Sequence, residues 1–337
     1  MPEYLVYAIV AIVGTAIIWK GSDLLERSAK KLSKYYGLPP IVHGAIVVAI
    51  GSSFPELSSA VLSTLIHGEF ELGLSAVVGS AIFNILLIPA LSGLFSKEPL
   101  KAEKELVYKD AQFYLIAVAV LLLTFSFAVI YNPSDKQPLT GEFTSWLALI
   151  PISLYFLYIF IQQQEVSEQE KLEKPKDVRP AKEWLLLFLS LALVLVGVEG
   201  LVRTALYLEE ALDVPGFVWG VTVIAIVTSL PDALISIRLA KKGEGVASLS
   251  NVLGSNIFDL LIAVPAGVLI AGSTTINLGL AAPLMAVLTF ATILLFTLLR
   301  TRLTLSRIEC WILLATYFLF VIWIVLENFK WVNFIPI

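Results

Sequence analysis

Ten apolar segments of membrane-spanning length are the feature that most constrains how this chain can fold. A transmembrane α-helix needs about 20 consecutive, mostly apolar residues. Hydrophobic residues fill 58% of the 337 positions and charged residues only 15%, so a water-soluble globule could not cover its own apolar surface. We therefore predict an all-α membrane protein with ten transmembrane helices. They lie near residues 4–20, 38–66, 72–95, 110–131, 143–163, 184–208, 214–240, 246–271, 276–299 and 306–328, and the first continues as an amphipathic stretch to about Tyr36.

The remaining composition argues against several classes of protein. The net charge of −4 gives no basic surface for nucleic acid. The single cysteine, Cys310, excludes an internal disulfide and a thiolate metal cluster, and two histidines are too few for a His-rich metal site. No nucleophile–base pair points to an enzyme. We expect a protein that is not an enzyme, carries no cofactor and has the lipid bilayer as its partner, and the oligomeric state is left open.

The distribution of Lys and Arg predicts the orientation. With ten spans, 20 of the 23 Lys and Arg residues fall on the connections of one side. An excess of basic residues marks the cytoplasmic side. Both termini are therefore expected outside, in a multi-pass protein of the plasma (cell) membrane, and the long polar connection 165–182 is expected to be a cytoplasmic loop. Glu199 and Arg203 can pair on one helix face, and His67 is expected to be solvated in a short outside loop.

The sequence also repeats itself. Residues 38–56 match residues 214–232 at eight of 19 positions, and the segment Gly79-Ser-Ala-Ile-Phe-Asn84 matches Gly254-Ser-Asn-Ile-Phe-Asp259. Each copy holds five spans, and because five is odd the second copy enters the membrane upside down. We predict two inverted five-helix repeats, 1–164 with its motif at 38–93 and 183–337 with its motif at 214–268, in one integrated membrane domain. Inverted repeats are typical of secondary transporters with a substrate site at the midplane.

Three acidic residues, Glu56, Asp232 and Asp259, lie well inside apolar spans. An acid at the centre of a spanning helix costs roughly 2.5–3.5 kcal/mol on insertion scales. The sequence offers no basic partner beside them at similar depth. Either these acids are protonated or a cation lies among them.

The residues next to the acids favour a hard cation. Pro55 and Pro231 lack an N–H, so each leaves a carbonyl one turn earlier without its helical donor and loosens that turn. Freed carbonyls, hydroxyls and carboxylates are oxygen ligands that suit Na⁺ and Ca²⁺. A neighbouring span in each copy presents further oxygens from residues four apart on one helix face. These pairs are Ser80 with Asn84, and Ser255 with Asp259.

The paired motifs resemble the α-repeats of the cation/calcium exchanger superfamily, which includes the sodium/calcium exchangers. Gly51-Ser-Ser-Phe-Pro-Glu56 resembles the first repeat and Thr228-Ser-Leu-Pro-Asp232 the second. The resemblance implies an antiporter that exchanges Na⁺ for Ca²⁺ by alternating access at one acidic midplane site, while spans 1 and 6 slide against the other helices. The implied Ca²⁺ ligands are Glu56, Asp232 and the carbonyls of Ser52 and Thr228. The implied Na⁺ ligands are Ala49, Ser53, Ser80, Ala225, Ser229 and Ser255, with Asn84 and Asp259 completing the centre.

Several alternatives stay open. Many prokaryotic members of the superfamily carry Glu where this chain has Asp232, and Asp259 is the residue type linked with K⁺ in the potassium-dependent branch. K⁺-dependent Na⁺/Ca²⁺ exchange and H⁺/Ca²⁺ exchange on the same scaffold are therefore alternatives. A more distant one is a cation channel, although channels usually gather charge by oligomerisation.

Overall fold

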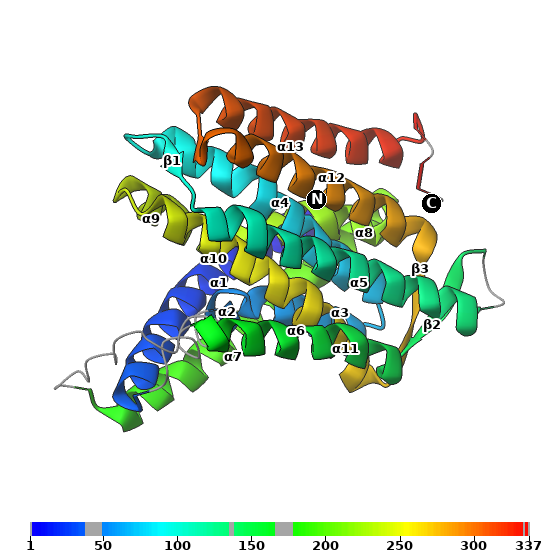
Figure 1. Ribbon diagram of the computed structural model, residues 1–337. Helices are drawn as coiled ribbons and strands as arrows, with labels where there is room; N and C mark the ends of the chain where they lie inside the picture. Colours follow the sequence, from blue (N-terminus) through cyan, green and yellow to red (C-terminus); the bar gives the residue numbers. More distant parts are fainter. Residues whose placement is uncertain (1, 38–48, 135–137, 166–177, 333, 336–337) are drawn as a thin grey trace.

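The computed structural model describes residues 2–37, 49–134, 138–165, 178–332 and 334–335, and it is built almost entirely from helices (Figure 1). The helices are α1 (Pro2–Tyr35), α2 (Ala49–Ser52), α3 (Phe54–Leu65), α4 (Phe70–Phe95), α5 (Ala111–Tyr131), α6 (Ser145–Glu165), α7 (Pro180–Leu212), α8 (Gly216–Trp219), α9 (Ala225–Lys241), α10 (Gly245–Phe258), α11 (Val264–Ala271), α12 (Leu278–Arg302) and α13 (Arg307–Asn328). Three π-helical turns, Leu106–Asp110, Gly220–Ile224 and Asp259–Ala263, lead into α5, α9 and α11.

The helical, multi-pass architecture is confirmed. Within the described ranges, nine helices are long and apolar enough to cross a membrane. They coincide with nine of the ten predicted segments, and α1 reaches Tyr35 as expected for the first. The remaining segment, 38–66, coincides with α2 and α3 where it is described, while residues 38–48 lie outside the described residues, as does most of the polar connection 165–182. The count of ten spans and the inverted repeats stay predictions.

The two Pro–acid motifs differ in backbone structure. Before Pro55 the helix is interrupted, because α2 ends at Ser52, α3 begins at Phe54, and Ser53 between them has φ −92° and ψ 10°. Pro231 instead lies inside the continuous helix α9, so residues 227–229 stay helical although Pro231 has no N–H to donate to the carbonyl of Val227. The irregular turn in this span is the π-helical segment Gly220–Ile224, ahead of α9. A π-helical turn accommodates one extra residue without breaking the helix.

Two short antiparallel ribbons, which the sequence did not predict, join the connections between helices. Strand β1 (Leu100–Lys101) pairs with β4 (Thr304–Leu305), and β2 (Thr140–Thr144) pairs with β3 (Ser273–Asn277). Six candidate spans separate β1 from β4 and four separate β2 from β3. Because both numbers are even, each ribbon joins two connections on the same side of the membrane if every candidate span crosses once. The ribbons lie toward opposite ends of the helices (Figure 1).

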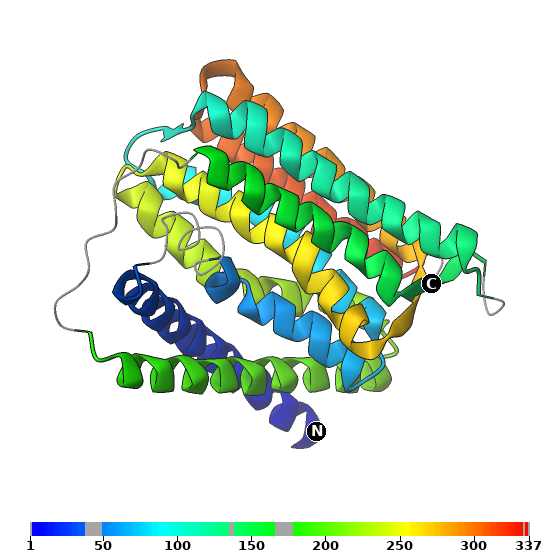
Figure 2. The same cartoon turned by 60° about the horizontal axis from the view of Figure 1, so that its bottom comes forward.

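Helix α4 forms the centre of the bundle and the other helices surround it (Figures 1 and 2). In the most apolar stretch of α4, 89% of the residues are buried, whereas the corresponding stretches of α6 and α1 have 17% and 22% of their residues buried. A helix that is apolar on every face is stable only where other helices cover it. At one edge of the bundle α1 and α7 cross closely, because Gly14 and Gly197 face each other: a Cβ built at Gly14 would lie 3.0 Å from the carbonyl oxygen of Gly197.

Candidate functional site

Three acidic side chains are buried in the helical bundle. Glu56 lies in the first turn of α3, Asp232 in the middle of α9, and Asp259 opens the π-helical turn that follows α10. None is more than 1% exposed. Among the described residues, no Lys or Arg forms an ion pair with any of them. The predicted burial of three acids without a basic partner is therefore what the structure shows.

Serine hydroxyls connect the two halves of the sequence around Glu56. Ser80 on α4 donates to Glu56 Oε1 at 3.2 Å, and its oxygen lies 2.6 Å from the hydroxyl of Ser229 on α9. The hydroxyls of Ser52 on α2 and Ser255 on α10 lie 3.3 Å apart. All four serines are at most 2% exposed. Contacts between serines thus join the two matched motifs at two points.

Polar side chains lie beside the other two carboxylates. Ser52, Ser255 and Asn251 are neighbours of Asp232, and Ser53 is a neighbour of Asp259. Asp259 in turn lies within electrostatic range of both Glu56 and Asp232. No described group is in hydrogen-bonding geometry with either oxygen of Asp232 or of Asp259. Each of the three acids thus lies within electrostatic range of the other two.

The site is rich in oxygen atoms that lack a donor. Besides the four Asp oxygens, Glu56 Oε2, Asn84 Oδ1 and Ser53 Oγ have no described hydrogen-bond partner. Each buried acceptor left without a partner costs about 1–3 kcal/mol. A hard cation would satisfy several of them at once. No three His, Cys, Asp or Glu side chains in the described part of the chain converge closely enough to hold a metal ion, so neutral oxygens would have to complete its ligands.

Three further residues of the implied ligand set, Thr228, Ala225 and Ala49, lie on α9 and α2. Thr228 is 1% exposed, and its hydroxyl donates to the carbonyls of Ile224 at 3.0 Å and Ala225 at 3.3 Å. Ala225, the first residue of α9, is likewise 1% exposed. Ala49 is the first residue of α2, but its side chain is outside the described part of the structure.

Two buried residues near the site, Asn256 and Tyr114, were not selected from the sequence. Asn256 on α10 accepts a hydrogen bond from Asn84 Nδ2 at 3.0 Å, and its own Nδ2 lies 3.0 Å from the hydroxyl of Tyr114 on α5. An amide in the middle of an apolar span needs hydrogen-bond partners on neighbouring helices. That feature could have identified Asn256, whereas nothing in the sequence places Tyr114 beside it.

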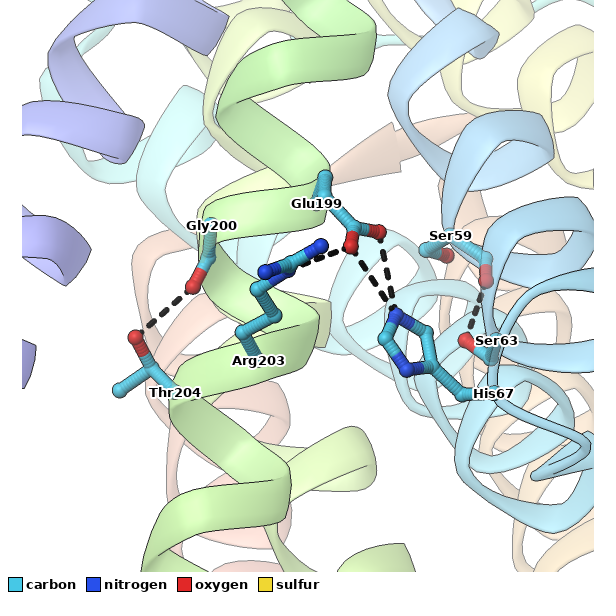
Figure 3. A network of polar contacts seen from close by, with 7 residues as sticks. All are labelled: Ser59, Ser63, His67, Glu199, Gly200, Arg203 and Thr204. Carbon is cyan, nitrogen blue, oxygen red and sulfur yellow. Dashed lines mark hydrogen bonds and ion pairs between the residues drawn. The ribbon is translucent and has the colours of Figure 1, made fainter.

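A second polar network links α3 to α7, shown in Figure 3. The predicted pair is present, with Arg203 Nε 2.6 Å from Glu199 Oε1. His67 was expected in solvent, but its Nε2 lies 3.1 Å from the same oxygen and its side chain is 16% exposed. The carboxylate of Glu199 therefore holds both a neighbour on its own helix and the segment that follows α3.

A close helix contact holds α4 against the span that contains Asp232. A Cβ built at Gly79 would lie 2.7 Å from the carbonyl oxygen of Val221 and 2.8 Å from its Cα. We expect Gly79→Ala to lower the free energy of unfolding by about 1–3 kcal/mol because the backbone must shift. Thermal unfolding in detergent measures this effect. Gly200→Ala is the control, since its Cβ would meet only Val10 Cγ1 at 3.2 Å; equal stability of both variants would contradict the prediction.

Comparison with known proteins identifies the family. The family model described as sodium/calcium exchanger protein matches residues 6–163 and 182–326. Sodium/calcium exchanger MaX1 of Methanosarcina acetivorans is 26% identical over 284 residues, which cover 75% of this chain and 80% of that protein. Human sodium/potassium/calcium exchanger 4 is 35% identical over 148 residues, but they cover only 44% of this chain and 21% of that protein.

Solved structures agree with the sequence comparisons. The sodium-calcium exchanger NCX_Mj matches with a TM-score of 0.62 and 25% identity, covering 95% of this chain and 99% of that one. The matched family model spans both halves of the sequence, including every residue of the buried acidic site. This chain therefore belongs to the sodium/calcium exchanger protein family.

Proposed function

We propose that the protein is a secondary active antiporter that exchanges Na⁺ for Ca²⁺ across the membrane by alternating access. The observation that carries the proposal is the set of three carboxylates, each at most 1% exposed and without a described basic partner. If these carboxylates only stabilised the fold, Lys or Arg side chains would neutralise them. A site for a transported cation must instead keep its carboxylates free of such partners. Membership of the exchanger family supports the same function.

The proposed ligands divide between the two ions. Glu56 and Asp232 would bind Ca²⁺ with the carbonyls of Ser52 and Thr228. Na⁺ would take oxygens from the residues that surround them, with Asn84 and Asp259 completing the centre. These residues are Ala49, Ser53, Ser80, Ala225, Ser229 and Ser255. The contacts of Ser80 with Glu56 and Ser229 support a shared site because one hydroxyl touches both halves of the sequence.

Coupling would follow from competition for the same carboxylates. A buried negative charge without a counter-ion is costly in low dielectric, so the protein would change its access side only with Ca²⁺ or with several Na⁺ bound. Three Na⁺ for one Ca²⁺ would move one net charge, worth about 2.3 kcal/mol per 100 mV. We further propose that the two inverted five-helix repeats build this site at the midplane, with both termini outside the plasma membrane.

The direct test is uptake of ⁴⁵Ca²⁺ into proteoliposomes loaded with Na⁺. We expect uptake only with an outward Na⁺ gradient, with no uptake when choline replaces internal Na⁺. Uptake without any counter-ion inside the vesicle would indicate a channel and contradict antiport.

K⁺-dependent exchange is a second candidate. Asp232, Asp259 and the similarity to human sodium/potassium/calcium exchanger 4 favour it. The same vesicles with K⁺ included or omitted distinguish the two, because Na⁺/Ca²⁺ exchange alone would be insensitive to K⁺. A pH gradient in place of the Na⁺ gradient tests H⁺/Ca²⁺ exchange.

Asp259→Asn is expected to change the ion coupling more than the affinity for Ca²⁺. Asp259 is proposed to serve the Na⁺ sites, so losing its charge should raise the half-saturating Na⁺ concentration and reduce the steepness of the Na⁺ dependence. The measurement is the Na⁺ dependence of ⁴⁵Ca²⁺ uptake beside direct ⁴⁵Ca²⁺ binding. A complete loss of Ca²⁺ binding in this variant would contradict the assignment.

A further inference from the structure

A chain of buried amide groups lies behind the acidic site. Asn256 Nδ2 donates to the backbone carbonyl of Ala81 at 3.0 Å and lies 3.0 Å from the Tyr114 hydroxyl. Asn256 Oδ1 accepts from Asn84 Nδ2 at 3.0 Å. The side chains of Asn84, Asn256 and Tyr114 are all fully buried. The chain therefore joins α4, α10 and α5 where water does not compete.

The carbonyl of Ala81 fixes the direction of every hydrogen bond in this chain. A backbone carbonyl can only accept, so the nitrogen of the Asn256 amide must face it. The oxygen of Asn256 must then face Asn84, and because that oxygen can only accept, Asn84 must offer its nitrogen. The remaining atom of the Asn84 amide is consequently its oxygen, which has no described hydrogen-bond partner.

The orientation of Asn84 matters because its two amide atoms act on a cation in opposite ways. Oδ1 is a hard oxygen ligand, whereas the NH₂ group carries partial positive charge and repels a cation. Asn84 lies one helical turn after Ser80, whose hydroxyl touches Glu56. We infer that Asn256 is a positioning residue, which makes Asn84 present oxygen rather than nitrogen at the cation site. This inference rests on the proposed function and gives a role to Asn256, which lies in the second matched motif but is not among the proposed ligands.

The proposed role of Asn256 explains why the two motifs differ at this position. The first motif carries Ala81 and the second Asn256 at the matching position. Asp259, which matches Asn84, has two equivalent carboxylate oxygens and offers oxygen in either orientation. Only the half that uses an amide ligand needs an orienting partner. That partner comes from the other half, and it donates to the carbonyl of the residue it matches.

The test is a double-mutant comparison in Na⁺-loaded proteoliposomes, read as half-saturating Na⁺ concentration. Asn256→Ala removes the acceptor of Asn84, and Asn256→Leu does so while keeping the number and branching of the side-chain heavy atoms. We expect each variant to raise the half-saturating Na⁺ concentration about tenfold, because Asn84 no longer holds its oxygen toward the ion and a polar contact with a charged group is lost. Asn84→Ala should give the same shift, and adding Asn256→Ala to it should change nothing further, because Asn256 acts through Asn84.

Tyr114→Phe is the matched control. It removes a polar contact of the same Asn256 nitrogen but leaves the Ala81 carbonyl, so the Asn84 orientation and the Na⁺ dependence should stay within about twofold of wild type. Additive effects of Asn84→Ala and Asn256→Ala, or equal effects of Tyr114→Phe and Asn256→Leu, would overturn the inference and indicate a packing role. Wild-type vesicles that fail to exchange Na⁺ for Ca²⁺ would instead contradict the proposed function.

Discussion

Glu56→Gln is expected to abolish Na⁺-dependent Ca²⁺ uptake while the protein still folds. Gln has nearly the same shape, and its amide oxygen can still accept the hydrogen bond that Ser80 donates at 3.2 Å. What disappears is one of the two negative charges proposed to balance Ca²⁺. Removing one partner of a buried charge pair costs about 3–5 kcal/mol, which corresponds to a loss of affinity on the order of 100-fold or more.

The measurement is ⁴⁵Ca²⁺ uptake by Glu56→Gln in proteoliposomes, with gel filtration and thermal unfolding in detergent to verify folding. Glu98→Gln is the matched control, because the Glu98 side chain is 76% exposed and lies 3.7 Å from Lys101 at the surface. That control should transport like wild type. Ca²⁺ uptake at the wild-type rate in Glu56→Gln would show that this carboxylate does not bind the transported ion.

Asp232→Asn should also abolish Ca²⁺ transport, but it should stabilise the cation-free protein. Neither carboxylate oxygen of Asp232 accepts a hydrogen bond from a described residue, and the side chain is 1% exposed. Replacing this unbalanced charge with a neutral amide removes a burial cost of about 1–3 kcal/mol. The stabilisation that Ca²⁺ gives by binding the folded state should vanish at the same time.

Thermal unfolding with and without Ca²⁺ separates these two effects of Asp232→Asn. The expected result is a higher unfolding temperature than wild type without cations and no further rise when Ca²⁺ is added. Asp213→Asn makes the same chemical change at an exposed position with φ 54°, a conformation that Asn tolerates well, so it should behave like wild type. A destabilised Asp232→Asn protein without cations would indicate that the carboxylate has a structural partner.

Much of the architecture could be predicted from the sequence because hydropathy is a local property. Nine described helices coincide with predicted apolar segments, and the burial of Glu56, Asp232 and Asp259 follows from their positions within such segments. The break before Pro55 was equally predictable, since proline removes a donor wherever it stands. Pro231 also lacks this donor, but the helix around it is not interrupted, and the irregular turn of that span lies earlier, at Gly220–Ile224.

The contacts of the site were decided only by tertiary structure. Ser80, Ser229 and Asn84 could be selected from the sequence as candidate ligands. The sequence could not show that the two serine hydroxyls lie 2.6 Å apart, or that Asn84 forms a hydrogen bond with Asn256. It also placed His67 in solvent, whereas the packing of α3 beside α7 brings it to Glu199. Apolar residues show that a helix spans the membrane, but its rotation and tilt are set by packing against neighbouring helices. Which oxygens face one another is therefore a property of the assembled bundle.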